Sequence, residues 1–212
     1  MRRLILLVVG FAGLAGFTGT AKAQSELASD AARLVRVLEL RPGQTIADIG
    51  AGSGQLAVAL AHEVGPSGHV YATELNEGRL RDIRQAVDSA GLRNVAVVEA
   101  HATRTNLPEQ CCDALVLRRV YHHFAKPHLM NTSMRQSLKP GGLLAVIDFD
   151  PDSAESADPA RRATGDQHGV TSATVVRELR EAGFDVVTVE EGSGSGRFMV
   201  VARRPVGSGQ SR

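Results

Sequence analysis

The sequence predicts an α/β fold in which a mostly parallel sheet carries helices on both faces and closes with an antiparallel hairpin. Three observations lead to this prediction. Short apolar runs of β character alternate with amphipathic segments of helical spacing through most of the 212 residues. Near the C-terminus, two β-type runs flank a Gly- and Ser-rich stretch at 192–196, a pattern typical of a hairpin. No repeat or interdomain linker interrupts the pattern, so we expect one domain.

The first half of the chain is expected to form an opening helix followed by three strands and two helices in alternation. That helix is expected to begin at Ser25, because Leu27, Leu34 and Leu38 recur at helical spacing, and to end before Pro42. The expected strands are Thr45–Asp48, His69–Glu74 and Val95–Glu99, and the expected helices are Gln55–Glu63 and Glu77–Ala90.

The second half continues the alternation and adds a long loop. The expected elements are a strand at Asp113–Arg118, a helix at Pro127–Leu138, a strand at Leu143–Phe149, a helix at Thr171–Ala182 and a hairpin of Asp185–Glu190 with Phe198–Ala202. The strongly apolar strand Leu143–Phe149 is expected to be buried on both faces. A loop rich in Asp, Ser, Pro and Ala follows it, from Asp150 to about Gly169.

The most informative stretch is the loop after the first strand, which contains Gly50, Gly52 and Gly54. Glycines here allow positive φ angles and let the backbone approach a ligand closely. The loop lacks the Gly-Lys-Ser/Thr ending of a phosphate-binding P-loop, and its G-x-G-x-G spacing differs from the G-x-G-x-x-G of dinucleotide loops. Asp48 stands two residues before the first glycine, where it would repel a pyrophosphate and favour a cationic ligand.

These residues resemble the first motif of the class I, Rossmann-like S-adenosylmethionine-dependent methyltransferases. The stretch 46–54, IADIGAGSG, matches that motif at every defined position, and Glu74 matches the acid that ends the second strand of the family. The stretches around 106–108, 119–124, 138–142 and 178–184 resemble later family segments in the same order. The resemblance implies a three-layer α/β/α fold with a mostly parallel seven-stranded sheet.

The resemblance also implies S-adenosyl-L-methionine as cofactor and a set of residues that bind it. The expected cofactor-binding residues are Asp48, Gly50, Ala51, Gly52, Ser53, Gly54, Glu74, Leu75, His101, Ala102 and Arg118. In the family, an acid after the third strand often reaches the adenine; here His101 and Thr103 are the available polar side chains, and Arg104 adds positive charge.

Candidate catalytic residues follow the fourth strand, at the edge of the sheet that would face the methyl group. We assign Tyr121, His122 and His123 to this role, since a histidine can accept a proton near neutral pH; packing or helix capping is the alternative for the two histidines. His168, after the long loop, is the candidate for orienting the substrate. Asp148 is expected to shape the floor of the pocket.

Three further expectations concern metal binding, the exposure of two arginines and the state of the two cysteines. The aspartates of the loop after 149 match no calcium-loop spacing, so no metal site is expected. The adjacent Arg161 and Arg162 are expected on a solvated face. Cys111 and Cys112 are adjacent; a vicinal disulfide is possible, and two thiols are favoured.

The N-terminus resembles an export signal. Arg2 and Arg3 precede an apolar run that is shorter than the roughly 20 residues of a bilayer span, and Ala21–Ala23 forms an A-x-A cleavage pattern. We therefore expect a signal peptide at 1–23, a domain at 24–204, a disordered tail at 205–212, and a periplasmic location without a membrane span. An uncleaved anchor, a twin-arginine signal, or a cytoplasmic location with a non-functional signal remain alternatives.

The charge of the mature domain indicates which classes of partner it can bind. Cleavage would remove three of the 24 basic residues and leave 21 against 23 acidic ones, with no basic block, which disfavours nucleic acid. The favoured function is methyl transfer to a small-molecule acceptor. The alternative is an exported, non-catalytic binding or scaffold protein that retains the fold.

Overall fold

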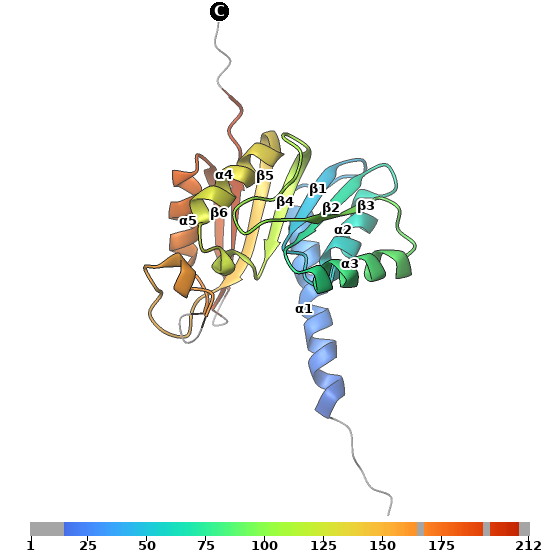
Figure 1. Cartoon of the computed structure of the whole chain (residues 1–212), viewed down its shortest axis with the longest axis horizontal. Coiled ribbons are helices and arrows are strands. Elements are labelled where there is room, and N and C mark those ends of the chain that lie inside the picture. The colour runs from blue at the N-terminus through green and yellow to red at the C-terminus, as the bar shows by residue number, and fades with distance from the viewer. Residues whose placement is uncertain (1–14, 165–167, 193–195, 208–212) are drawn as a thin grey trace, which may run out of the picture.

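The computed structural model describes residues 15–164, 168–192 and 196–207, and it contains one seven-stranded sheet with helices on both faces (Figure 1). The strands are β1 (Thr45–Ile49), β2 (His69–Glu74), β3 (Val95–Glu99), β4 (Cys112–Arg118), β5 (Leu138–Phe149), β6 (Asp185–Glu191) and β7 (Arg197–Arg203). The helices are α1 (Ala15–Val37), α2 (Gln55–Val64), α3 (Glu77–Ser89), α4 (Pro127–Ser137) and α5 (Ser172–Glu181), with short 3₁₀ turns at Tyr121–His123 and Pro159–Arg161. The predicted fold class is confirmed.

The strand order is β3-β2-β1-β4-β5-β7-β6, and β7 alone runs in the direction opposite to the other six strands. From β1 the chain first winds outward through β2 and β3, then returns to place β4 on the other side of β1. The order of winding therefore reverses between β1 and β4. In an open α/β sheet a ligand binds beyond the carboxyl ends of the strands at such a point.

The two faces of the sheet have separate apolar cores. Along β1, Ile46 faces the core formed with α1, α2 and α3, whereas Ala47 faces the core formed with α4 and α5. This alternation follows from the two-residue period of a strand, and because both faces are covered, the inner strands consist of apolar residues throughout. The five parallel strands are thereby held with their carboxyl ends at one edge.

Two elements begin several residues before their predicted starts, whereas the others begin within one residue of the prediction. α1 begins at Ala15 within the described residues, ten residues before the expected start at Ser25, and its first turns project from the body of the domain (Figure 1). The stretch before Ser25 contains no Pro, the residue that most strongly stops a helix, so the helix can extend through it. β5 begins at Leu138, because Leu138 pairs with Cys112 before a register shift, and not at Leu143.

Of the two alternatives for the cysteines, the favoured one, two thiols, was wrong, and the vicinal disulfide is the one observed. Cys111 and Cys112 are joined by a disulfide where the chain enters β4, and there is no free cysteine in the part of the chain described. Adjacent cysteines can form this bond when both side chains turn to the same side, which a sequence pattern does not reveal.

Among the described residues, no helix combines the length and the apolar character that crossing a bilayer requires. Residues 1–14, which hold most of the predicted signal, and 208–212 of the predicted tail lie outside the described residues.

Candidate functional site

A cavity of about 840 Å³ opens at the carboxyl ends of β1, β2 and β4, at the point where the strand order reverses. Eight of the eleven predicted cofactor-binding residues line it: Asp48, Gly50, Ala51, Gly52, Ser53, Glu74, Leu75 and Arg118. Residues from three strands and the loop after β1 therefore converge on one space, as the sequence motifs predicted.

The glycines of this loop meet different surroundings. At Gly50 (φ +71°), a Cβ atom would stand 2.4 Å from Val120 Cγ2, so this glycine allows close contact between the loop and the segment after β4. At Gly52 (φ +57°), a Cβ atom would meet nothing within 4 Å. Gly52 lines the cavity, so its missing side chain leaves room for a ligand beside the backbone.

Asp48 is a buried acid whose partners are incomplete. The side chain is 1% exposed, and its Oδ2 atom has no hydrogen-bond partner among the described residues. Burial raises the pKa of Asp48 from 3.8 to about 7, the positive charge of Arg118 opposes this rise, and the negative charge of Glu74 adds to it. An uncompensated carboxyl group in a cavity wall is suited to a cationic or hydrogen-bond-donating ligand.

Glu74 connects the end of β2 to the glycine loop. Its Oε2 accepts a hydrogen bond from the Gly52 N–H (3.1 Å), and its Oε1 accepts one from the Leu75 N–H (2.7 Å). The carboxylate is thus fixed in orientation at the cavity wall. Beside it, Leu75 is 55% exposed and offers the cavity an apolar surface.

Arg118 is held in place by the first helix. Its Nε donates to Asp30 Oδ2 over 2.7 Å, and Arg197 Nη2 donates to the same oxygen over 2.7 Å. Asp30 belongs to α1, so this buried acid joins α1 to β4 and β7 and fixes the positive charge near Asp48.

Three predicted cofactor residues do not line the cavity. Gly54 packs against α3, where a Cβ atom would stand 3.1 Å from the Ile83 Cα. His101 and Ala102 lie in an exposed turn closed by a bridge between His101 and Arg104. Their contact with a cofactor stays a prediction.

The cavity also has lining residues that were not among the predicted site residues: Ala23, Gln24, Leu27, Gln55, Leu56, Arg79, Arg119 and Val120. Three of them belong to α1, which lies far from the motifs in sequence. In the segment after β4, the close approach of Val120 to Gly50 places Val120 at the cavity wall.

The three predicted histidines lie together. His122 is buried, and its Nδ1 lies 2.8 Å from Asp148 Oδ1, while its backbone N–H donates to Asp148 Oδ2 over 3.2 Å. The ring centres of His122 and His123 are 4.0 Å apart, and those of His122 and His168 are 4.5 Å apart. Burial, with the charges of His122 and His168, lowers the pKa of His123. Asp148 therefore orients His122 and does not line the cavity floor as expected.

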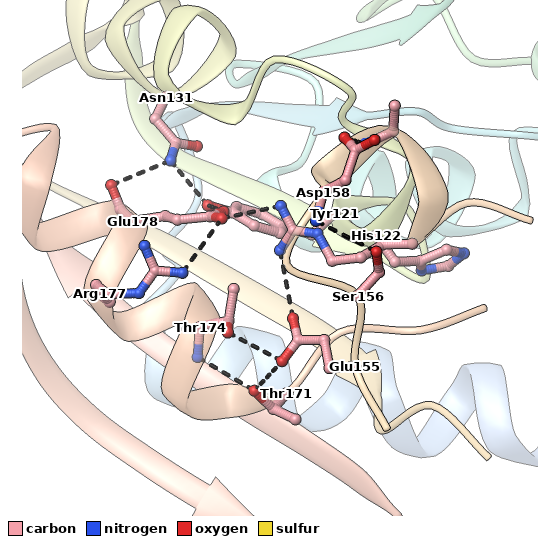
Figure 2. Close-up of polar contacts among 12 residues, drawn as sticks. Tyr121, His122, Asn131, Glu155, Ser156, Asp158, Thr171, Thr174, Arg177 and Glu178 are labelled. Carbon is pink, nitrogen blue, oxygen red and sulfur yellow. Dashed lines mark hydrogen bonds and ion pairs between the residues drawn. The ribbon is translucent and has the colours of Figure 1, made fainter. Parts of the chain in front are cut away.

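Tyr121 has a different position from the one predicted. Figure 2 shows its hydroxyl donating to Glu178 Oε2 (3.0 Å) and accepting from Asn131 Nδ2 (2.8 Å). The side chain is fully buried, and burial, with the charge of Glu178, raises the pKa of Tyr121 well above its usual value. Tyr121 does not line the cavity. This environment supports a structural role.

Arg162 contradicts the expectation of a solvated face. Its side chain is 1% exposed, and its guanidinium forms ion pairs with Glu178 (2.8 Å) and Glu155 (3.5 Å). Glu155 Oε2 in turn accepts hydrogen bonds from the hydroxyls of Thr171 (2.6 Å) and Thr174 (2.9 Å) (Figure 2). The buried arginine thereby fastens the loop after β5 onto α5.

Comparisons with known proteins agree with this geometry. Residues 46–142 match a family model described as a methyltransferase domain. A ubiquinone/menaquinone biosynthesis C-methyltransferase UbiE of Bordetella parapertussis is 36% identical over 110 residues, which cover 52% of this chain and 42% of that protein. The chain thus matches less than half the length of this curated relative.

Solved structures resemble the fold over most of its length. A SAM-dependent methyltransferase from Aquifex aeolicus superposes with a TM-score of 0.70 at 26% identity, covering 82% of this chain and 89% of that one. A possible exported protein from Bordetella parapertussis superposes with a TM-score of 0.67 at 20% identity, covering 86% and 68%, and this likeness concerns the fold alone.

The matched region spans the glycine loop, the acid after β2 and the segment that enters β5. The lining of the cavity and the strand order agree with the same assignment. Residues 46–142 therefore form a methyltransferase domain, and the fold around them is that of the class I S-adenosylmethionine-dependent methyltransferases.

Proposed function

We propose that this chain is an exported enzyme that transfers a methyl group from S-adenosylmethionine to a small-molecule acceptor. The observation that carries the proposal is the cavity at the carboxyl end of β1, where a bare glycine and two carboxyl groups face one space. A volume of about 840 Å³ lies within the range of small-molecule sites, roughly 300–1,000 Å³.

The residues present fit the cofactor. Asp48 offers a buried carboxyl oxygen that has no partner in the described chain, and Gly52 leaves space where a side chain would stand. Glu74, held by the Gly52 N–H, is placed to accept hydrogen bonds from ribose hydroxyls, as the family motif implies. When bound, the cofactor supplies a methyl group made electrophilic by a sulfonium.

The acceptor side of the cavity is formed by the segment after β4. Of the three residues predicted as catalytic, His123 alone lines the cavity, next to Arg119 and Val120. We assign His123 to contact with the acceptor, and we assign His122 and Tyr121 to positioning the segment. Alignment of an acceptor beside the methyl group is the main contribution that the protein makes to such a transfer.

Export is supported by two features of the chain. The N-terminal charge, apolar run and Ala21–Ala23 pattern form a signal with a cleavage point before Gln24. The disulfide between Cys111 and Cys112 suits an oxidising compartment. Cleavage after Ala23 would leave Gln24 and Leu27 at the cavity.

The proposal is tested by calorimetric titration of the full chain with S-adenosylmethionine and with S-adenosylhomocysteine. We expect saturable binding of both ligands at one site per chain. Absence of heat with either ligand up to near-millimolar concentration would remove the methyltransferase proposal. An exported, non-catalytic binding protein would then be the better description.

A further inference from the structure

We propose that His122, His123 and His168 bind a divalent transition-metal ion at the edge of the cavity. Each residue offers one ring nitrogen, and these three atoms lie within 4.8 Å of one another. Two of the histidines come from the 3₁₀ turn after β4, and the third comes from the loop between β5 and α5. The site goes beyond the proposed methyl transfer, and it departs from the expectation that the chain has no metal site.

His122 is already arranged as a metal ligand. The Asp148 carboxylate lies 2.8 Å from Nδ1, and when ionised it accepts from Nδ1–H, which leaves Nε2 of the neutral imidazole with a free lone pair. Nε2 is buried and has no hydrogen-bond partner among the described residues. A carboxylate behind a histidine in this way is the usual support of metal-bound imidazoles, because it fixes the tautomer and the ring orientation.

His123 and His168 can complete the site with small movements. Both side chains are exposed, whereas His122 is fixed. Metal–nitrogen bonds of 2.0–2.1 Å in tetrahedral geometry place ligand nitrogens about 3.4 Å apart. The distances between the three nitrogens, which are now up to 4.8 Å, must therefore shorten by at most roughly 1.4 Å. Rotation of the two exposed imidazoles can supply this change.

The ligand set selects the type of ion. Three imidazole nitrogens suit Zn²⁺, Co²⁺, Ni²⁺ or Cu²⁺, whereas Mg²⁺ and Ca²⁺ require oxygen ligands. Three protein ligands leave at least one coordination position for water or another molecule. His123 also lines the cavity, so that position lies near the space assigned to the acceptor.

The test is a calorimetric titration of the full chain, first freed of metal by a chelator, with Zn²⁺ and separately with Mg²⁺. We expect one saturable Zn²⁺ site and no binding of Mg²⁺. His123→Ala and His168→Ala should each weaken Zn²⁺ binding by at least about 100-fold, because even the loss of an outer-shell partner costs about 10–100-fold. Asp148→Asn should weaken it by about 10–100-fold.

His128→Ala is the matched control, since His128 is an exposed histidine on α4 outside the cluster, and it should leave Zn²⁺ affinity unchanged. Absence of Zn²⁺ binding by the wild-type chain overturns the site. Equal Zn²⁺ affinity in wild type, His123→Ala and His168→Ala also overturns the site. So does a loss of Zn²⁺ affinity in His128→Ala as large as in the other two variants. Either result would mean that the three rings only stack on one another and that Zn²⁺ binds adventitiously. Titration of the same wild-type sample with S-adenosylhomocysteine reports on the proposed function separately, because the two ligands use different groups.

Discussion

Asp48 shows at the scale of one residue how a binding site reduces the stability of the free protein. A carboxyl group that is 1% exposed and has an oxygen without a partner opposes folding whenever it is charged. Arg118 offsets only part of this effect, because the pKa of Asp48 still stands at about 7. The residue is therefore better explained by a ligand than by packing.

This explanation predicts a pH-dependent effect of Asp48→Asn. The pKa of Asp48 is raised from 3.8 to about 7 on folding, so the folded state holds the proton more tightly, and stability falls as pH rises through this window. Asparagine does not titrate. The difference between the free energies of unfolding of Asp48→Asn and wild type should therefore shift by about 2–3 kcal/mol in favour of the variant between about pH 5 and about pH 8.

Urea denaturation of both proteins at the two pH values measures this difference. A difference between variant and wild type that stays constant with pH would contradict the assignment. The variant should also bind S-adenosylmethionine more weakly, since it lacks the negative charge.

At the scale of elements, α1 is attached to the sheet by Asp30. Its carboxylate pairs with Arg118 and Arg197 from two different strands, and all three side chains are largely shielded. A second pair, Arg33 with Glu190, also joins α1 to the sheet but is about one-third to two-fifths exposed. The Asp30 contact is more buried, and it includes two arginines where Glu190 has one.

Asp30→Ala should therefore lower the free energy of unfolding by about 2–4 kcal/mol, since it leaves two shielded guanidinium groups without this carboxylate. Glu190→Ala should cost less than about 1 kcal/mol, because exposed ion pairs contribute little. Denaturant midpoints of the two variants decide the matter. Equal losses would show that Asp30 has no special role in attaching α1.

The loop after β5 offers a comparable pair in two adjacent arginines. Arg162→Ala removes the cation that pairs with the shielded Glu155 and leaves Glu178 with only the longer pair to Arg177 (3.8 Å), so it should cost about 3–5 kcal/mol. Arg161→Ala should change stability by less than about 0.5 kcal/mol, since Arg161 is exposed and its ion pair with Asp158 is long at 4.0 Å. Thermal unfolding of both variants is the measurement, and similar midpoints would disprove a structural role for Arg162.

Much of the fold and of the cofactor site could be predicted because the signals are local. The order of strands and helices follows from apolar periodicity, and Asp48, Gly52 and Glu74 sit at strand ends that a parallel sheet brings to one edge. Eight predicted cofactor residues line one cavity for this reason.

The remaining features depend on contacts between distant segments. From the sequence alone Arg162 is predicted to be a surface residue, because Glu155 and Glu178 come beside it only in the folded chain. His168 is 45 residues from His123 in sequence, and only the loop after β5 brings the two together. The contribution of α1 to the cavity was missed because it needs the packing of α1 against the carboxyl edge of the sheet.

At the scale of the whole molecule, the position of the predicted cleavage site is compatible with a stable mature domain. The first turns of α1 project from the body, whereas Asp30 and the buried Leu34 lie after the cleavage point (Figure 1). Cleavage before Gln24 would thus remove the projecting turns and keep the contacts of Asp30 and Leu34 that attach the helix.

Expression of the full chain in a Gram-negative host should therefore yield a periplasmic protein that begins at Gln24. Cell fractionation followed by intact mass spectrometry measures both location and cleavage. Ala23→Leu should block cleavage, because the A-x-A pattern requires a small residue at this position. A full-length protein found only in the cytosol would contradict export.

The central claim is that the space beside Gly52 receives the cofactor, and a matched pair of glycine variants tests it most directly. Gly52 and Gly91 have similar backbones (φ +57° and +65°), and a Cβ atom would meet nothing within 4 Å at either, but only Gly52 lines the cavity. Both Gly→Ala changes should cost about 1 kcal/mol of stability. In equilibrium dialysis with labelled S-adenosylmethionine, we predict that Gly52→Ala weakens binding by at least about tenfold and that Gly91→Ala binds like wild type; equal affinity in all three proteins would contradict the account.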